Sequence, residues 1–497
     1  MLAHHPLGAR LPDSAHAVCA SLPTMADVIG YEEKDPRVME KLDLGYPRFI
    51  PHIYLRRLLE HLRRRRGWGE RDAFLVASEG AARRLLDHAR PKDAEVKTEE
   101  GFVAVHFPRD PGAADRARLF LQHTGCGISS RQAEDALIQE GKLAARQAEE
   151  IVEGDGAAQC VEMLRAASGA RSAEDLFLCR SGMNAFHAVF LALQRAQAAR
   201  GRDLWLQIGW LYLDTQRILE KFTAAPSSFL WIHDPLDQRA IEEAFERHGA
   251  RIAGVVTETP TNPLVLTGDI PRLAELSRAH GAALILDPST VGLANVDALP
   301  HADTLVVSLT KYASNRGDVM AGLIVVNRSS PFAEALRRDL GEFVEPLYPR
   351  DAARLAWAAR EMDRISREGS VNTERLAEWI ARHPSVARVH WAGAGGSRRN
   401  YEILARGKNC FGAMLSVELK RPLAEVFDRL RCVKAPSFGA RFTMACPFVY
   451  LTHYERAKDE AGRRWLRERG LEPELLRVSP GVEPFDRIRE AFEEALA

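Results

Sequence analysis

Short apolar runs alternate with amphipathic helical stretches along the chain after residue 170. The runs are rich in Val, Ile and Leu and end at small or polar residues, which is typical of buried strands. We expect strands at Leu176–Cys179, Leu204–Ile208, Ser228–Ile232, Ile252–Thr257, Ala283–Leu286, Thr304–Val307 and Gly322–Val326. Between them the pattern predicts helices such as Met183–Ala199, Gln238–His248 and Ile270–His280. This alternation of strands and helices predicts an α/β fold with a mostly parallel sheet covered by helices on both faces.

The pattern changes on either side of this alternation. From about Pro331 to Arg382 the chain is helix-rich, and strands near Val386–Trp391 and Ala413–Glu418 follow, which predicts a smaller C-terminal α+β domain. Nearer the start, a helix is expected at Tyr54–Arg66 and a strand at Ala73–Ala77, and we interpret the charged, Pro- and Gly-rich residues 91–116 as a surface excursion. The expected divisions are an N-terminal extension at 1–170, a large domain at 171–335 and a small domain at 336–497.

Composition narrows the class of protein. The 497 residues are 46% hydrophobic, and Lys plus Arg equal Asp plus Glu at 68 each, so we expect neither nucleic acid nor a membrane surface as a partner. The seven cysteines are scattered without a C-x-x-C pair, which favours a reducing, cytoplasmic setting without a disulfide framework or metal site. No apolar run approaches the length of a membrane span or a signal peptide.

Two polar residues stand at the ends of neighbouring apolar runs. Asp287 follows Ala283–Leu286, and Lys311 follows Thr304–Val307 after a short polar tract. Pyridoxal 5′-phosphate (PLP) requires such a pair, because an amine forms a Schiff base with its aldehyde and a carboxylate keeps its pyridine nitrogen protonated. Taken singly, a solvated loop lysine and a capping aspartate are the simpler interpretations. The argument for a PLP site therefore depends on the other strand ends.

Two further strand ends carry residues that suit a cofactor. The turn Ser181-Gly182-Met183 leads from a predicted strand directly into a helix, and the free N–H groups there suit a phosphate. Such a turn is also common without any ligand. Tyr212 follows Leu204–Ile208 and could lie over a flat aromatic cofactor or be a partly buried rim residue.

Two more residues have functional and structural interpretations that stay open. Asn262 lies between Pro260 and Pro263, which fix a rigid extended turn and so could orient its amide towards a ring substituent. The same sequence could simply brace the turn. Arg477 lies on a short apolar strand and needs an anionic partner, which could be a substrate carboxylate or a structural ion pair.

Together these segments resemble the Cys/Met metabolism family of PLP enzymes, which has the aspartate-aminotransferase-like fold (fold type I). The family motifs occur in the same order here, as Ser181-Gly182-Met183, Tyr212-Leu213-Asp214-Thr215, Pro260-Thr261-Asn262-Pro263, Asp287-Pro288-Ser289-Thr290, Ser308-Leu309-Thr310-Lys311 and Arg477-Val478-Ser479-Pro480-Gly481. The resemblance covers roughly residues 175–497. One departure is that Leu213 and Asp214 replace the glycines that follow the family's tyrosine.

The resemblance implies a role for each matching residue. Lys311 is expected to form the Schiff base and then shuttle protons, Asp287 to pair with the pyridine nitrogen, and Tyr212 to stack on the ring and assist catalysis. The remaining expected cofactor-binding residues are Ser181, Gly182, Met183, Asn262, Ser289, Ser308 and Thr310. Arg477 is expected to bind the substrate carboxylate.

Another segment bears on the reaction. Lys434–Gly439 resembles the family's substrate-binding loop, in which Ser437 faces the substrate. Pro436, Phe438 and the long N-terminal region are similar to the fungal-type cystathionine γ-synthases. The resemblance implies γ-replacement on an O-acyl-L-homoserine with L-cysteine, which gives cystathionine. The alternatives are sulfhydrylation with sulfide, β- or γ-cleavage of cystathionine, or a catalytically silent PLP-fold protein.

The family also carries a Y-x-R motif that reaches the cofactor phosphate of a neighbouring subunit. The literal match is Tyr46-Pro47-Arg48, although it lies much farther from Gly182 than is usual. Arg131 lies closer to Gly182, so Arg48 and Arg131 are both candidates for the phosphate. The resemblance further implies a homo-oligomer, specifically a dimer-based tetramer.

Overall fold

The computed structural model describes residues 1–46 and 48–497, and Pro47 of the Y-x-R match lies outside the described residues. Its largest sheet has seven strands in the order β6-β12-β11-β10-β9-β7-β8. Only β12 pairs antiparallel with its neighbours in this sheet of the described chain. The strands are β6 (Leu176–Cys179), β7 (Leu204–Ile208), β8 (Phe229–Ile232), β9 (Ile252–Glu258), β10 (Ala283–Asp287), β11 (Thr304–Ser308) and β12 (Gly322–Val326). The seven predicted strands are therefore confirmed, with small shifts at their ends.

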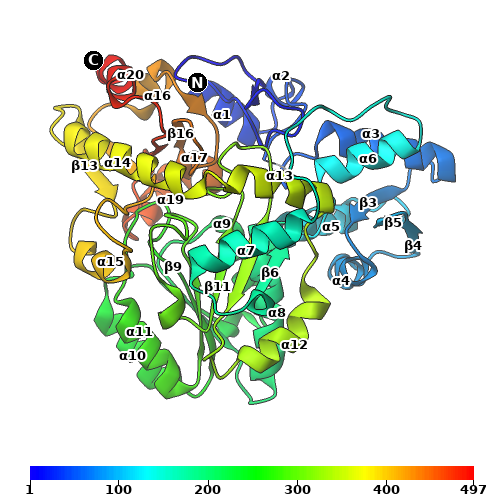
Figure 1. The fold of residues 1–497 in the computed structure, drawn as a ribbon, viewed down its shortest axis with the longest axis horizontal. Coiled ribbons are helices and arrows are strands. Elements are labelled where there is room, and N and C mark those ends of the chain that lie inside the picture. Colours follow the sequence, from blue (N-terminus) through cyan, green and yellow to red (C-terminus); the bar gives the residue numbers. More distant parts are fainter. Residues whose placement is uncertain (47) are drawn as a thin grey trace.

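Helices cover both faces of this sheet, as Figure 1 shows. Ile285 packs in one layer with residues of α8, whereas Leu284 and Leu286 pack in the opposite layer. This explains the continuous apolar runs, because strands buried on both faces have no polar side. The helices are α7 (Gly156–Ser168), α8 (Gly182–Ala198), α9 (Leu213–Lys221), α10 (Gln238–His248), α11 (Ile270–His280), α12 (Ala333–Phe343), α13 (Pro349–Ala359) and α14 (Met362–Ile380), with short 3₁₀ turns at Ala173–Asp175, Pro226–Ser228 and Leu299–His301.

A second sheet lies towards the C-terminus and has five strands in the order β13-β14-β17-β16-β15. Its strands are β13 (Val386–Trp391), β14 (Leu415–Leu419), β15 (Val433–Lys434), β16 (Met444–Pro447) and β17 (Leu476–Ser479). Its helices are α15 (Arg398–Leu404), α16 (Leu423–Arg429), α17 (Phe448–Thr452), α18 (Tyr454–Ala457), α19 (Glu460–Arg467) and α20 (Phe485–Leu496). The molecule is thus an α/β protein with a large mixed sheet and a smaller C-terminal α+β part.

Residues 53–139 form a compact unit with its own sheet, which we call the N-terminal module and which projects on the right of Figure 1. Its strands pair antiparallel in the order β3-β5-β4. Its elements are α3 (Ile53–Arg66), β3 (Asp72–Val76), α4 (Glu79–Ala89), β4 (Glu95–Glu99), β5 (Phe102–Phe107), α5 (Pro111–Thr124) and α6 (Ser130–Gln139). Before the module come β1 (Arg10–Leu11), β2 (Cys19–Ala20), α1 (Met25–Glu32) and α2 (Pro36–Met39).

The interpretation of residues 91–116 as a surface excursion is wrong. This stretch contains β4, β5 and the start of α5, and β5 is the buried central strand of the module. Val105 packs against the α4 and α5 layer, whereas Ala104 packs against the α3 and α6 layer. Some of the charged residues that suggested a loop belong to β4, an edge strand with exposed side chains, where charge is common.

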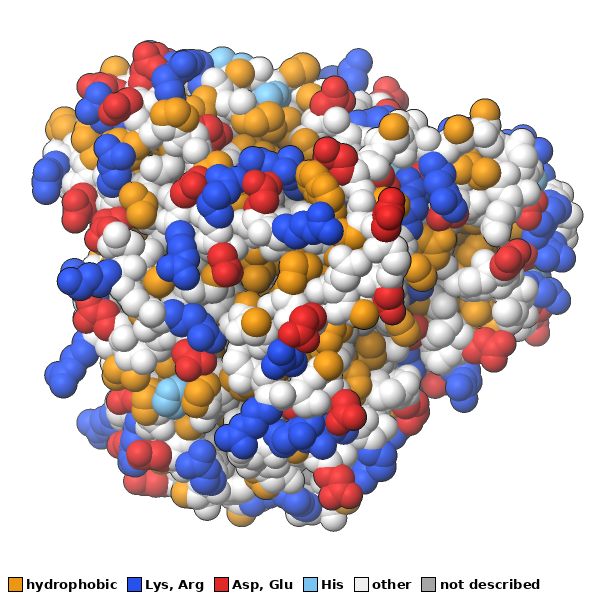
Figure 2. Space-filling model, in the orientation of Figure 1, with side chains coloured by type: hydrophobic (Ala, Val, Ile, Leu, Met, Phe, Trp, Pro, Cys, Tyr) orange, Lys and Arg blue, Asp and Glu red, His pale blue; other side chains and the backbone are white. Residues whose placement is uncertain are grey.

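The surface agrees with the balanced charge. Figure 2 shows Lys and Arg side chains interspersed with Asp and Glu over the face in view. None of the described helices is both long and apolar enough to span a bilayer. The proposed boundaries near residues 170 and 335 stay predictions.

Candidate active site

A cavity lies where β9, β10 and β11 end, at the carboxyl edge of the large sheet. Parallel strands direct their C-terminal residues to one edge, which is why ligands bind there in open α/β sheets. Among the predicted site residues, those that line the cavity are Arg48, Ser181, Gly182, Met183, Tyr212, Asn262, Asp287, Ser289, Ser308, Thr310, Lys311 and Arg477. Segments that are far apart in the sequence therefore meet at one place.

Lys311 is buried in this cavity, with 7% of its surface exposed. Its Nζ donates hydrogen bonds to the hydroxyls of Tyr46 and Ser437, each at 3.2 Å. The ammonium also lies 4.6 Å from the ring centroid of Phe438. Ser437 thus adjoins the predicted catalytic lysine, and Lys311 is not a solvated loop residue.

Asp287 is a half-buried carboxylate that ends β10 and faces the cavity. The Ser289 N–H donates to its Oδ1 at 2.8 Å. Burial raises the pKa of Asp287, while the bonds from Ser289 and the charge of Lys311 oppose that rise. Within the described chain no Lys, Arg or His nitrogen lies within 4.0 Å of the Asp287 carboxylate. Its other oxygen can therefore accept a hydrogen bond from a cationic partner such as a protonated ring nitrogen.

The start of α8 forms a tight cradle beside Ser308. Ser181 caps the helix, its Oγ accepting from the Asn184 N–H at 3.0 Å. The next N–H groups, of Gly182 and Met183, have no acceptor inside a helix and line the cavity. A Cβ on Gly182 would lie 3.0 Å from the Ser308 Cβ, so a larger residue would fill the cradle. These donors and hydroxyls suit an anion.

Arg477, on β17, and Asn262, in the turn after β9, also line the cavity. Arg477 Nη1 donates to Asn262 Oδ1 at 3.0 Å, and Nη2 donates to the Ser437 carbonyl at 3.1 Å. Arg477 is only 5% exposed, and no carboxylate of the described residues lies within 4.0 Å of its guanidinium. The structural ion pair considered from the sequence is therefore not found there, and its charge can serve a ligand.

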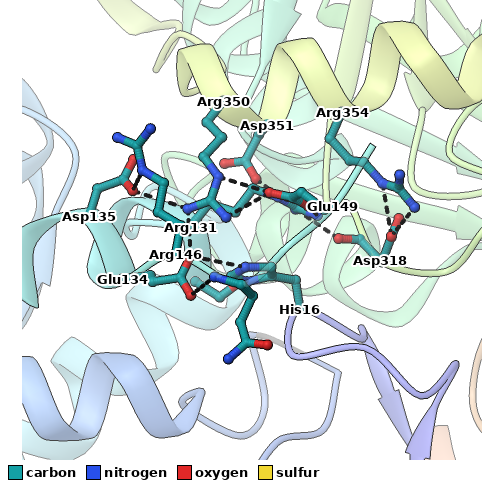
Figure 3. Close-up of polar contacts among 12 residues, drawn as sticks. His16, Arg131, Glu134, Asp135, Arg146, Glu149, Asp318, Arg350, Asp351 and Arg354 are labelled. Atoms are coloured by element: carbon teal, nitrogen blue, oxygen red, sulfur yellow. Dashed lines mark hydrogen bonds and ion pairs between the residues drawn. The ribbon is translucent and has the colours of Figure 1, made fainter. Parts of the chain in front are cut away.

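The two arginine candidates for the phosphate lie in different surroundings. Arg48 reaches the cavity of its own chain, where Nη1 donates to Asp214 Oδ2 at 2.6 Å and Nη2 donates to the Tyr212 hydroxyl. Arg131 lies outside the cavity and pairs with Glu149 at 2.7 Å and Asp351 at 3.0 Å (Figure 3). Only Arg48 of the two is placed to meet a cofactor.

Sequence reasoning missed several cavity residues. Glu258 ends β9 beside Asp287, and its Oε1 accepts from the Tyr212 N–H at 2.6 Å. Burial and the neighbouring charge of Asp287 raise its pKa. The strand-end argument that singled out Asp287 would have found Glu258 too. Met320 also lines the cavity, but no local pattern marks it.

Comparisons with known proteins identify the family. The family model "Cys/Met metabolism PLP-dependent enzyme" matches residues 162–497. The chain belongs to this family. An L-2-amino-4-chloropent-4-enoate dechlorinase/desaturase from Streptantibioticus cattleyicolor is 36% identical over 485 residues, covering 98% of this chain and 97% of the relative. A cystathionine γ-synthase from Neurospora crassa is 26% identical and covers 99% of this chain and 98% of the relative.

Solved structures agree on the fold. A cystathionine γ-synthase from Xanthomonas oryzae pv. oryzae, crystallised with aminoacrylate and cysteine, matches with a TM-score of 0.59 at 24% identity. The match covers 69% of this chain and 86% of the other. The expected fold type I architecture is thereby confirmed.

The residues fit PLP, the cofactor of this family. Lys311 supplies an amine, Asp287 supplies a half-buried carboxylate without a cationic partner among the described residues, and the α8 cradle supplies donors beside Gly182, where a Cβ would crowd Ser308. The protein is therefore a PLP-dependent enzyme of the Cys/Met metabolism family. Its substrate and reaction need a separate argument.

Proposed function

We propose that this enzyme expels a leaving group from the γ-carbon of an L-α-amino acid. The observation that carries the proposal is the position of the Lys311 amine. It shares one cavity with the α8 cradle and Arg477, and it donates to the hydroxyl of Ser437, whose carbonyl accepts from Arg477. A substrate whose carboxylate meets Arg477 would present its α-carbon, and then its β-carbon, to the same amine. A leaving group can depart from the γ-carbon only after protons have been removed from the α- and β-carbons, so one base that reaches both carbons is needed.

The proposed roles follow from the contacts. Arg477 holds the substrate carboxylate through its planar fork, and Asn262 fixes the orientation of that fork. Lys311 Nζ removes the α-proton, passes it on to the Tyr46 or Ser437 hydroxyl in hydrogen-bond reach, and is then free to remove a β-proton. PLP, when bound, supplies an electron sink for the negative charge that develops at the α-carbon. Asp287 and the Ser181–Met183 cradle hold its two ends.

A neighbouring cavity of about 350 Å³ has room for a small γ-substituent. It shares Tyr46, Tyr212, Pro436 and Arg477 with the cofactor cavity. Much of its wall is aliphatic or aromatic, including Leu22, Leu42, Phe49, Ile50, Phe448 and Leu451. The dechlorinase relative acts on an amino acid whose chlorine is on the γ-carbon, which supports elimination of halide or another small group.

A second candidate is the γ-replacement expected from the sequence, in which cysteine takes the place of the departing group. The cystathionine γ-synthase relative spans the whole chain, and the Lys434–Gly439 loop places Ser437 against Lys311. Both candidates share every step up to departure of the γ-group. They differ only in whether a thiol then adds.

Product analysis with and without L-cysteine tests the proposal. The substrates are L-2-amino-4-chloropent-4-enoate, O-acetyl-L-homoserine and O-succinyl-L-homoserine, and the products are measured by mass spectrometry. We expect the chlorinated substrate to lose chloride without cysteine, and Lys311→Ala to abolish the loss. Cystathionine as the main product would favour the second candidate. Consumption of β-chloro-L-alanine alone would contradict both.

A further inference from the structure

Glu258 is a buried carboxyl group in the cofactor cavity, and none of the steps proposed above uses it. It is the last residue of β9 and is 5% exposed. Its Cα pairs with that of Asp287, the last residue of β10, so two carboxyl groups stand side by side at the ends of adjacent parallel strands. A buried acid needs either a cation beside it or a proton on it.

The carboxyl group of Glu258 supports the turn that leads to Tyr212. β7 ends at Ile208, which pairs with Thr257 of β9, so the chain leaves β7 close to the end of β9. Glu258 Oε1 then accepts from the Tyr212 N–H at 2.6 Å. Tyr212 caps α9 without a capping bond from its own side chain. Glu258 therefore supplies the acceptor that fixes the backbone of the residue expected to lie over the cofactor ring.

The surroundings of Glu258 favour a proton on its carboxyl group. The other charged or titratable side chains that line the cavity are Tyr46, Arg48, Tyr212, Asp287, Lys311 and Arg477. Burial and the charge of Asp287 raise the pKa of Glu258. The N–H groups of Tyr212 and Asn262 and the charge of Arg477 oppose that rise, but do not cancel it.

Asp287 is the better placed of the two carboxyl groups to carry a negative charge. The Ser289 N–H donates to it at 2.8 Å, and the charge of Lys311 also favours its ionised form. Two neighbouring carboxyl groups in a cavity do not both ionise readily, because like charges repel strongly away from bulk water. One negative charge on the pair is also what a single protonated ring nitrogen can neutralise.

We propose that Glu258 is a positioning residue that acts in its protonated form. Its carbonyl oxygen accepts from the Tyr212 N–H and holds the turn of that tyrosine at the cavity, while Asp287 carries the negative charge of the pair. A second negative charge here would lie in the same cavity as the cofactor phosphate and the substrate carboxylate, and would weaken the binding of both. Glu258 has this role in either reaction considered above.

Two variants separate the hydrogen-bond acceptor of Glu258 from its charge. Glu258→Gln keeps a carbonyl acceptor and cannot ionise, whereas Glu258→Ala leaves the Tyr212 N–H without an acceptor. When the apoenzyme is titrated with PLP, we expect Glu258→Gln to bind nearly as tightly as wild type and Glu258→Ala about ten- to hundredfold more weakly. Glu246→Gln, at an exposed position of α10, is the matched control. A large loss of PLP affinity in Glu258→Gln would overturn the proposal, because it would show that the negative charge is needed.

The visible circular dichroism of bound PLP reports the positioning role separately from overall stability. The signal depends on how the side chains around the ring are arranged, and Tyr212 is the residue expected to lie over that ring. With PLP at saturation, we expect Glu258→Gln to keep the wild-type signal and Glu258→Ala to change its intensity or sign. A wild-type signal in Glu258→Ala would contradict the positioning of Tyr212 by Glu258.

Denaturant unfolding of the apoenzyme at several pH values tests the protonated form, and it needs only the wild type and Glu258→Gln. The unfolded side chain titrates near 4.5, so above this pH the folded protein holds a proton that the unfolded chain releases. The free energy of unfolding of the wild type should therefore fall relative to that of Glu258→Gln as the pH rises from about 5 to 8. A difference that does not change with pH would show that Glu258 is ionised when folded, and would overturn the proposal. Because no turnover is measured, this result is independent of whether the proposed γ-chemistry is correct.

Discussion

At the scale of single residues, Arg477 shows how burial and charge define a site. Its guanidinium is held by Asn262 and the Ser437 carbonyl, neither of which neutralises it. A buried cation without a carboxylate is unfavourable unless a ligand supplies the missing charge. We take this as the reason why an arginine occurs on an otherwise apolar β17.

Replacing Arg477 tests its role towards the substrate. Arg477→Gln is expected to raise KM about ten- to hundredfold, since a charged hydrogen bond is lost, with a smaller effect on kcat. Arg477→Lys should recover only part of the affinity, because lysine lacks the planar fork. Steady-state kinetics measures both. An unchanged KM in Arg477→Gln would contradict the assignment, and exposed Arg37→Gln serves as the control.

Residues at strand ends could be predicted, whereas contacts between distant segments could not. Lys311 and Asp287 follow apolar runs, so their meeting at one edge of a parallel sheet follows from topology alone. Arg48 and Asp214 are 166 positions apart, and no local pattern indicates their pairing. Arg131 and Arg48 were indistinguishable in the sequence for the same reason.

At the scale of elements, α8 links the site to the N-terminal module. Its first turn lines the cofactor cavity, and farther along it His187 packs against Phe120 of α5 and against Phe222, with ring centroids at 6.1 and 5.5 Å. Burial lowers the pKa of His187 to about 3. The helix therefore carries a neutral histidine in an aromatic contact with the module.

His187 predicts a pH dependence of stability. Its pKa is about 3 when folded and near 6.5 when unfolded, so between these values the unfolded state binds more protons. The free energy of unfolding should thus fall as pH drops below 6.5, by up to about 1.4 kcal/mol per pH unit from this residue. His187→Leu should show a correspondingly smaller slope in denaturant unfolding. Equal slopes in variant and wild type would contradict the assignment.

Elements with a strong apolar pattern were predictable, and those set by tertiary contacts were not. The strands of the large sheet are apolar on both faces, so each run marks a strand regardless of context. The charged β4 could not be distinguished from a loop, because its pairing with β5 decides its structure. The side chains of β5 point alternately into two core layers, one formed with α4 and α5 and the other with α3 and α6. The sequence of β5 alone does not show that both faces are covered.

At the scale of the whole molecule, a buried ion cluster joins the N-terminal module to the rest of the chain (Figure 3). Arg131 of α6 binds Asp351 of α13 and the Asp318 carbonyl, which lies on the loop after Lys311. Glu149 bridges Arg131 and Arg350. The cluster therefore fixes the module against α13 and the loop that follows Lys311.

Removing Arg131 should affect stability without affecting the cofactor. Arg131→Met leaves Asp351 without its charged partner and Glu149 with Arg350 alone, and we expect a loss of about 3–5 kcal/mol in the free energy of unfolding. PLP affinity at a temperature where the variant is folded should stay near wild type. A large loss of PLP affinity with little loss of stability would instead place Arg131 at the phosphate.

Hydrogen exchange in D₂O tests the central claim most directly, because it reports where the enzyme removes protons. L-2-Aminobutanoate has α-, β- and γ-carbons but no leaving group, so it cannot be consumed by γ-elimination. We expect NMR to show deuterium entering both its α- and β-positions with the wild-type enzyme, and neither position with Lys311→Ala. Exchange confined to the α-position would contradict chemistry at the γ-carbon.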